Sequence, residues 1–377
     1  MKIEEIDGNF ANNTIDGIDL TFVEMPQPPF ELDGFPFYKE NKAFCRLPVS
    51  FLPACSEGVQ ALAWHTAGGQ LRFRTDSPVF AVRVKLLKIP AMSHMPATGS
   101  SGFDMYLGTG TSKCYWRTAI PDVRGDEYAS IILDVRELSR PAADRLRFLP
   151  DSNLREITLN FPDYNGVKKL EIGLAPKSSV LPPARFSIEK PILFYGSSIT
   201  QGGCCSRPGN NYIQHISRRL DAETINLGFS GNAIGEENMA ELIASLELSA
   251  FVMDYDHNAP DPEHLERTHE KFFQIIRDRR PSLPVVFMSM PNTDFNPGFE
   301  CTHDYASYAE RRKNIIERTY LNALGKGDMN VYFIDGASLF GLKDRDACTV
   351  DSCHPNDLGF LRMADALEPV LRRALNI

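Results

Sequence analysis

Residues 194–202 read Phe-Tyr-Gly-Ser-Ser-Ile-Thr-Gln-Gly and extend a short apolar run that begins at Ile192. An apolar run that ends in glycine predicts a buried strand followed by a sharp turn. Ser198 comes just after that turn, and ligands bind at the carboxyl ends of the strands in open α/β sheets. The stretch therefore predicts the first strand of an α/β sheet, with a candidate nucleophilic serine at its rim.

The chain after this stretch alternates between short apolar runs and segments with helical spacing. Four further strands are expected at 223–227, 251–253, 285–288 and 331–334, and helices at 212–220, 238–246, 263–279, 305–324 and 358–375. Strands that alternate with helices predict a parallel sheet covered on both faces. The second half is thus expected to be a five-stranded parallel sheet between helices.

The first half has a hydrophobic period of two, which is typical of strands with one buried face. The alternating runs are 71–74, 80–86, 157–161 and 169–174. Residues 176–185 contain three prolines and read as a linker. We therefore predict two domains, an antiparallel β-sandwich over residues 1–185 and an α/β domain over residues 186–377.

The composition narrows the class of protein. The net charge is −9 and no basic stripe is visible, so nucleic acid is not an expected partner. The first residues, Met1 to Asp7, are acidic and lack the apolar run of a signal peptide, and no stretch approaches the ~20 apolar residues of a membrane span. The sequence predicts a cytoplasmic protein without a membrane partner, and it does not indicate an oligomeric state.

The eight cysteines are scattered along the chain without the spacing of a zinc site. Reduced thiols in a cytoplasmic protein are the expected state. No cofactor and no metal are expected from these residues.

A second motif near the C-terminus supplies the partners that a serine nucleophile needs. Asp351 and His354 are spaced i, i+3, so both side chains can lie on one side of a turn, again at the carboxyl rim. A histidine takes the serine proton, and a carboxylate orients the histidine. Taken singly, Ser198 has the alternative reading of a helix cap, and the Asp-x-x-His motif that of a turn. Together, Ser198, His354 and Asp351 predict a catalytic triad.

These motifs resemble the blocks of the SGNH, or GDSL-type, hydrolases over roughly residues 190–377. Gly196-Ser197-Ser198-Ile199 stands where that family has Gly-Asp-Ser-Leu, so Ser197 replaces the aspartate. The resemblance implies a flavodoxin-like fold, with Ser198 as nucleophile and Asp351 and His354 in the last block.

Two more blocks imply the oxyanion hole. Asn226 to Gly231 matches the second block and implies the Gly228 backbone N–H as a donor beside that of Ser198. The third block, Gly-x-Asn-Asp, is matched only by Asn258, whose neighbours differ from the family pattern. A loop asparagine that bonds its own backbone is the alternative for Asn258. His257 beside it is a rival base.

The first half resembles the accessory domain of a subgroup of that family, which carries a Gly-x-Asp-Leu-Tyr signature. Gly102 to Tyr106 reads Gly-Phe-Asp-Met-Tyr. Asp104 and Tyr106 either shape the pocket entrance or, as we expect, serve a turn cap and packing between the domains. His264 and His269 lie in a charged helix and are expected to face solvent.

The expected function is a serine esterase. It would hydrolyse carboxylic esters through an acyl-enzyme. The expected substrate carries a short acyl group, such as acetyl, on a carbohydrate or another small molecule, and this choice of substrate rests on the resemblance. Two alternatives stay open: an acyltransferase that uses the same acyl-enzyme, and a carbohydrate-binding protein with a degenerate hydrolase domain.

Overall fold

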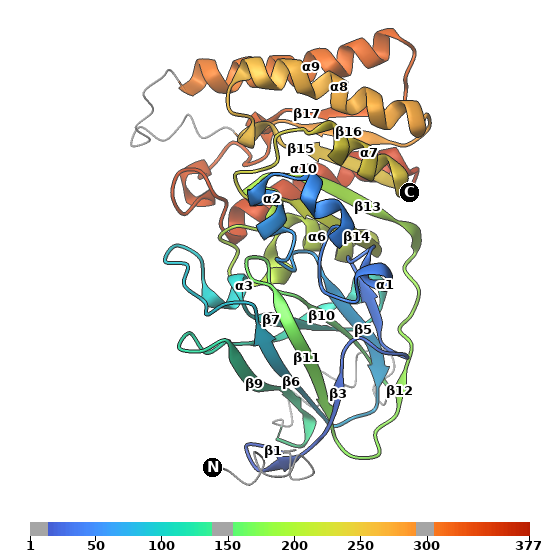
Figure 1. The fold of residues 1–377 in the computed structure, drawn as a ribbon, viewed down its shortest axis with the longest axis vertical. Helices are drawn as coiled ribbons and strands as arrows, with labels where there is room; N and C mark the ends of the chain where they lie inside the picture. Colours follow the sequence, from blue (N-terminus) through green and yellow to red (C-terminus); the bar gives the residue numbers. More distant parts are fainter. Residues whose placement is uncertain (1–13, 138–153, 292–304) are drawn as a thin grey trace.

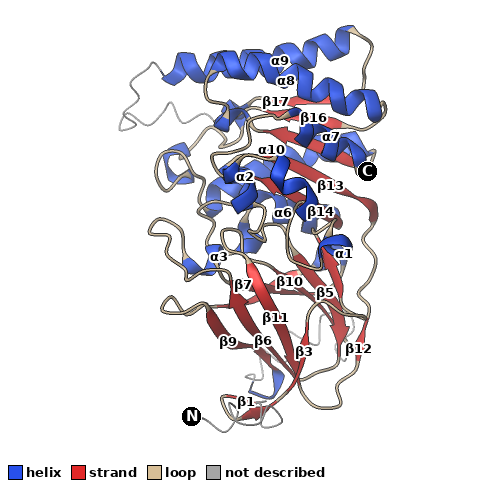
Figure 2. Ribbon diagram, viewed as in Figure 1, coloured by secondary structure: helices blue, strands red, loops and turns tan. Residues whose placement is uncertain are grey.

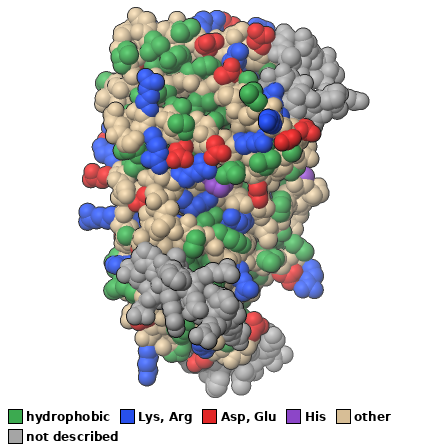
Figure 3. Space-filling model, turned by 180° about the vertical axis from the view of Figure 1, so that it is seen from behind, with side chains coloured by type: hydrophobic (Ala, Val, Ile, Leu, Met, Phe, Trp, Pro, Cys, Tyr) green, Lys and Arg blue, Asp and Glu red, His purple; other side chains and the backbone are tan. Residues whose placement is uncertain are grey.

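The computed structural model describes residues 14–137, 154–291 and 305–377. Its long axis runs from antiparallel sheets near the N-terminus to a parallel sheet with helices (Figures 1 and 2). Within the described ranges, no helix combines the length and apolar character needed to cross a membrane. On the face drawn in Figure 3, acidic and basic side chains are interspersed.

The antiparallel part is a sandwich of two sheets. One sheet has the order β12 (Val180–Leu181), β5 (Gln70–Thr75), β10 (Arg155–Asn160), β7 (Phe103–Leu107) and β8 (Cys114–Ala119), with β4 (Glu31–Asp33) also paired to β5. The other has the order β3 (Thr21–Glu24), β11 (Val167–Leu174), β6 (Val79–Leu86) and β9 (Glu127–Asp134). A hairpin of β1 (Thr14–Ile15) and β2 (Ile18–Asp19) precedes them.

The alternation seen in the sequence places one face of each sheet in the sandwich core. Leu71 and Phe73 of β5 pack there with Phe80 and Val82 of β6. The opposite face of the first sheet is polar but also buried, because it lies against the second half of the chain; Gln70, for example, donates to Gln214 of a later helix over 2.7 Å.

The second half has the predicted five parallel strands, which confirms the α/β fold class. Their order is β14 (Ala222–Gly228), β13 (Ile188–Gly196), β15 (Ala250–Asp254), β16 (Val285–Met288) and β17 (Val331–Ile334). The helices between and after them are α5 (Ser198–Gln201), α6 (Tyr212–Leu220), α7 (Glu237–Ser245), α8 (Pro262–Arg279), α9 (Tyr305–Gly325) and α10 (Asp357–Leu375).

Successive residues of β13 face opposite sides of this sheet. Leu193 and Tyr195 pack with the helices α7, α8 and α9, whereas Ile192 and Phe194 pack with α6 and α10. A strand buried on both faces is apolar at every position, which is why this run does not alternate.

A segment of the first half completes one side of the parallel sheet. Leu47, Leu52 and Val59, from the 3-10 helix η3 (Val49–Ala54), the helix α2 (Glu57–Leu62) and the chain before them, belong to the same apolar cluster as Leu193. Short helices also occur at α1 (Tyr38–Asn41) and α3 (Ala97–Ser100).

Two local expectations need correction. The predicted linker 176–185 contains β12, which pairs with β5, so part of it belongs to the sandwich. A proline just after His354 is a typical first residue of a helix, but Pro355 does not start α10. It pairs with Thr349 as an isolated bridge, and α10 begins at Asp357 with Asn356 as its cap. The Asn356 side chain accepts from the N–H groups of Leu358 and Gly359, which makes it a better start signal than the proline.

Candidate active site

The turn after β13 presents Ser198 at the carboxyl rim of the sheet. Ser197 caps the short helix α5 by accepting the Ile199 N–H, and Ser198 is the first residue of that helix. Gly196 is required here, because a Cβ would lie 2.2 Å from the carbonyl oxygen of Asp254. Ser198 is largely buried, with 5% of its surface exposed.

Ser198, His354 and Asp351 lie in one hydrogen-bonded line. The Ser198 Oγ is 2.9 Å from the His354 Nε2, and the His354 Nδ1 is 2.7 Å from the Asp351 Oδ2. The other oxygen of Asp351 accepts the backbone N–H groups of Cys353 and His354. Burial works to raise the pKa of Asp351, but these hydrogen bonds outweigh it and the pKa is lowered. The carboxylate therefore stays ionised opposite the imidazole.

The loop after β15 lies against the His354 turn. It forms the 3-10 helix η7 (Asp256–Asn258), and the His257 Nε2 is 3.1 Å from the Cys353 Sγ. Burial, followed by the charge of His354, lowers the pKa of His257 to about 4. The rival base is thus neutral and bonded to a thiol.

Asn258 is held at this loop by a buried arginine from α9. Arg312 donates to the carbonyls of Asp256 and Ala259, which flank His257 and Asn258. The Asn258 Oδ1 is buried without a hydrogen-bond partner. Its amide nitrogen has no acceptor among the residues that the structure describes, so this donor is available to a ligand.

Gly228 ends β14 beside the same rim, but its N–H is already engaged. It donates to the Asn226 Oδ1 over 2.8 Å, and a Cβ on Gly228 would lie 2.2 Å from the Gln201 nitrogen. Gly228 therefore allows two backbones to approach closely. Its N–H would have to leave Asn226, or be shared, to reach an oxyanion.

The next turn offers a different backbone donor. Gly231 is exposed, has φ of +70°, and its N–H has no acceptor within the described ranges. The turn lies near Ser198, because the Ser230 N–H donates to the Gln201 Oε1 over 3.0 Å and Gln201 ends the short helix that begins at Ser198. Sequence reasoning missed Gly231 because the family block was aligned on Gly228.

Several residues of the first half reach this rim. Tyr164 is one, and the Gln201 amide nitrogen contacts both the His65 Nδ1 and the Asp163 carbonyl. The exposed His94 ring is centred 6.2 Å from that of His354. No motif in the first half indicated these contacts.

A buried arginine also supports the rim from the first half. Arg46 is fully buried and donates to the carbonyls of Asn226 and Gly228 at the end of β14. Burial lowers the pKa of Arg46 to about 10, and the carbonyl groups satisfy its donors. No motif singles out Arg46 in the sequence.

Asp104 and Tyr106 lie between the two halves. Asp104 lies in the strand β7 and caps no turn, so the expected turn cap is wrong. Its carboxylate instead accepts hydrogen bonds from the Gly209 N–H and from Arg207. Tyr106 packs between the halves as expected, with its hydroxyl bonded to Arg207.

The expectation for the α8 histidines is wrong for His269. Its ring is buried and its Nδ1 is 2.9 Å from the Thr319 hydroxyl, and burial lowers its pKa to about 3. His264 contacts the Ile234 carbonyl. The charged residues of α8 masked the apolar stripe on which His269 lies.

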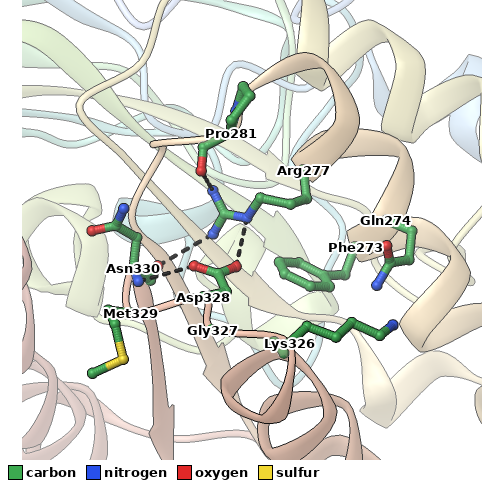
Figure 4. A pocket seen from close by; sticks show the side chains of 10 residues that line it. Phe273, Gln274, Arg277, Pro281, Lys326, Gly327, Asp328, Met329 and Asn330 are labelled. Carbon is green, nitrogen blue, oxygen red and sulfur yellow. Dashed lines mark hydrogen bonds and ion pairs between the residues drawn. The ribbon is translucent and has the colours of Figure 1, made fainter.

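Figure 4 shows a separate pocket. It lies at the amino end of β17, whereas Ser198 follows the carboxyl end of β13. Phe273, Gln274 and Lys326 line it, and Asn330 directly precedes β17. Arg277 is its central cation, and Asp328 and backbone carbonyls already bind it. The pocket offers no nucleophile with a base.

Two family models cover most of the chain. Residues 189–372 match the GDSL-like lipase/acylhydrolase family, and residues 20–180 match a model described as the N-terminus of SGNH-hydrolase-type esterases. No curated protein matches the chain.

Solved structures with a similar fold span nearly the whole chain. A protein from Bacteroides ovatus described as a GDSL-like lipase is 26% identical, with a TM-score of 0.82 over 95% of this chain and 99% of its own. A salicylyl-acyltransferase from a tetracycline biosynthetic pathway is 19% identical, with a TM-score of 0.74 over 95% and 98%. A family two carbohydrate esterase from Cellvibrio japonicus is 12% identical, with a TM-score of 0.57 over 95% and 98%.

Proposed function

Because the chain belongs to the GDSL-like lipase/acylhydrolase family and is an ester hydrolase, we propose that it works as a serine esterase through Ser198, His354 and Asp351. The observation that carries the proposal is the continuous line of two hydrogen bonds, 2.9 Å from Ser198 to His354 and 2.7 Å from His354 to Asp351. This is the geometry that general-base activation of a serine requires.

The reaction proceeds in two steps. The His354 Nε2 takes the Ser198 proton while the Oγ attacks the ester carbonyl, and the same proton then passes to the departing alkoxide as the ester C–O bond breaks. Water, deprotonated by His354, next attacks the acyl-enzyme. The bond between the acyl carbon and the Ser198 Oγ then breaks, His354 returns the proton to Oγ, and the carboxylic acid leaves. Asp351 keeps the imidazole oriented and stabilises its charged form.

The oxyanion of each tetrahedral intermediate needs N–H donors. The Ser198 N–H and the Asn258 amide are two of them, and both lack an acceptor among the described residues. For the third donor, the free N–H of Gly231 is favoured over that of Gly228, which Asn226 already occupies. Preorganised donors of this kind contribute about 10²–10³ in turnover each.

A short acyl group, such as acetyl on a carbohydrate, is the proposed substrate class. Support comes from the similar fold of an acetyl xylan esterase from Butyrivibrio proteoclasticus and of a carbohydrate esterase from Clostridium thermocellum in complex with cellohexaose. The likeness in fold includes both halves of the chain.

Hydrolysis of p-nitrophenyl esters from acetate to octanoate, by wild type and Ser198→Ala, tests this function. Activity that is greatest on acetate and absent from the variant supports it, and acetylated sugars are then the next substrates. A folded wild type that neither hydrolyses these esters nor reacts with a fluorophosphonate at Ser198 would contradict it and favour a binding role.

Acyl transfer is the second candidate, since the salicylyl-acyltransferase shares the fold over 95% of this chain. An alcohol acceptor would then replace water in the second step. Product analysis with added alcohols separates the two, because a transferase forms the new ester faster than the free acid.

A further inference from the structure

We infer that the Gly102–Tyr106 signature of the first half is a positioning element for the catalytic histidine. It forms a strut of hydrogen bonds from Asp104, through the segment Ser206–Asn210, to Asp357, three residues after His354. The inference rests on the proposed function in that His354 is taken to be the base.

One part of the strut joins Asp104 to the segment Ser206–Asn210, which follows the nucleophile. The Asp104 Oδ2 accepts from the Arg207 Nη1 over 2.6 Å and from the Gly209 N–H over 3.0 Å. Its Oδ1 accepts from the Asn160 amide over 2.8 Å. Asp104 is completely buried, so these charge-assisted bonds are not weakened by solvent.

The other residues of the signature support the same contact between β7 and the segment Ser206–Asn210. A Cβ on Gly102 would lie 2.5 Å from the Thr98 carbonyl, and the Thr98 hydroxyl binds the Ser206 carbonyl over 2.6 Å. Met105 is buried in the sandwich core, and Tyr106 binds Arg207 through its hydroxyl. Each position therefore either holds the strand or binds the segment.

The other part of the strut joins the segment Ser206–Asn210 to the start of α10. The Asp357 carboxylate accepts from the Ser206 N–H over 2.8 Å, from the Ser206 hydroxyl over 2.5 Å and from the Asn210 amide over 2.8 Å. The 3-10 helix η6 (Pro208–Asn210) contacts both β7 and α10. The strut thus spans from the sandwich to the helix that follows His354.

The strut matters to catalysis because the position of His354 decides how well it reaches Ser198. A misplacement of about 1 Å can cost 10²-fold in rate. The His354 turn is short, held by the Thr349–Pro355 bridge and by Asp351, so movement at Asp357 passes directly to the imidazole.

The chain offers conservative variants for a test. Every group that contacts the Asp104 or Asp357 carboxylate is a donor, so Asp104→Asn or Asp357→Asn turns an amide NH₂ toward a donor without changing size. Arg207 is partly exposed, and Arg207→Gln with Arg207→Lys as its conservative partner tests the strut if Asp104→Asn does not fold.

Glu223→Gln is the matched control. The Glu223 carboxylate also accepts a backbone N–H across the two halves, that of Gly34 over 3.0 Å, but it is not connected to the His354 turn. The strut predicts that kcat on p-nitrophenyl acetate falls about 10-fold in Asp104→Asn and Asp357→Asn, with KM within 2-fold, and stays near wild type in Glu223→Gln. Arg207→Lys should retain more kcat than Arg207→Gln.

The double variant separates a strut from two independent effects. If both residues act through one path, Asp104→Asn with Asp357→Asn loses no more kcat than the worse single variant. Losses that multiply, an unchanged kcat in folded single variants, or an equal loss in Glu223→Gln would each overturn the inference.

Amide hydrogen exchange decides the question independently of activity. Asp104→Asn should speed exchange in peptides covering residues 350–358, whereas Glu223→Gln should not. Unchanged exchange at 350–358 overturns the strut even in an active enzyme. Faster exchange in Asp104→Asn, combined with a wild type that has no esterase activity, would instead keep the strut and contradict the proposed function.

Discussion

The Tyr164 hydroxyl donates a hydrogen bond to the backbone carbonyl of Ser198 over 3.0 Å, so a residue of the sandwich touches the residue that carries the proposed nucleophile. The same carbonyl accepts the N–H groups of Gly202 and Gly203 within α5 and the turn after it. The first half of the chain therefore helps to fix the nucleophile as well as to cover it.

Removal of this hydroxyl should affect turnover more than binding. Tyr164→Phe is expected to cost about 1 kcal/mol of unfolding free energy. The looser Ser198 turn should lower kcat several-fold with KM unchanged. Tyr128→Phe is the control, because the buried Tyr128 hydroxyl also donates to a backbone carbonyl, that of Ser101, and not to a residue of the proposed triad. Equal kcat in the two variants would contradict the role given to Tyr164.

Asn258→Ala should abolish most catalysis while the fold remains. Its amide supplies a proposed oxyanion donor, so turnover should fall about 10²–10³-fold. Thermal unfolding should be close to wild type, since Asn258 is half-buried and its Oδ1 has no partner to lose. Wild-type turnover in this variant would remove Asn258 from the site.

The two glycines near the rim should respond differently to alanine. Gly228→Ala places a methyl group against the Gln201 backbone and should reduce both stability and activity. Gly231→Ala meets no atom within 4 Å and keeps its N–H; only its φ of +70° costs about 1 kcal/mol. Melting curves and ester hydrolysis for both variants check this, and a tolerated Gly228→Ala would show that the close approach is not needed.

Stability should fall as the pH rises through neutrality, partly because of Glu223. Burial, then the charge of Asp33, raises the pKa of Glu223 to about 7. A folded-state pKa above the unfolded value gives stability that is fully present below the unfolded pKa of 4.5 and is lost as pH rises through 7. The loss attributable to Glu223 should be on the order of 3 kcal/mol.

Urea unfolding at pH 5 and pH 8 measures this effect. Glu223→Gln should flatten the difference between the two pH values, whereas Glu237→Gln on the exposed surface should not. An unchanged difference in Glu223→Gln would assign the pH dependence to other buried carboxyls, such as Asp163 and Asp254, whose pKa values burial also raises.

The elements of the α/β half could be predicted closely from the sequence, because its short apolar runs alternate clearly with segments of helical spacing. The strand expected at 285–288 is found at those residues, and the helix expected at 263–279 begins one residue earlier. Ser198, His354 and Asp351 could be named because two short motifs fall at strand ends. The interpretation of their roles is still a prediction.

The contacts between the halves could not be predicted from one sequence. Arg46, Tyr164 and Asp357 bind backbone groups or partners more than 30 residues away, and no local pattern records such a contact. The Gly228 N–H donates to the Asn226 side chain, and the spacing of residues in the sequence does not reveal that hydrogen bond. The buried His269 was hidden because charged neighbours dominate its helix.

The packing of residues 45–63 against the parallel sheet limits how modular this protein is. Leu47 and Val59 fill the same core as Leu193, and Arg46 saturates the carbonyls at the end of β14. A gene fragment that starts at residue 186 would encode a parallel sheet with an uncovered apolar face, and the carbonyl groups that Arg46 binds would have no donor. Such an exposed apolar face favours self-association. Chimaeras that exchange the two halves between relatives should therefore fail unless this stretch is transplanted together with the sheet it covers.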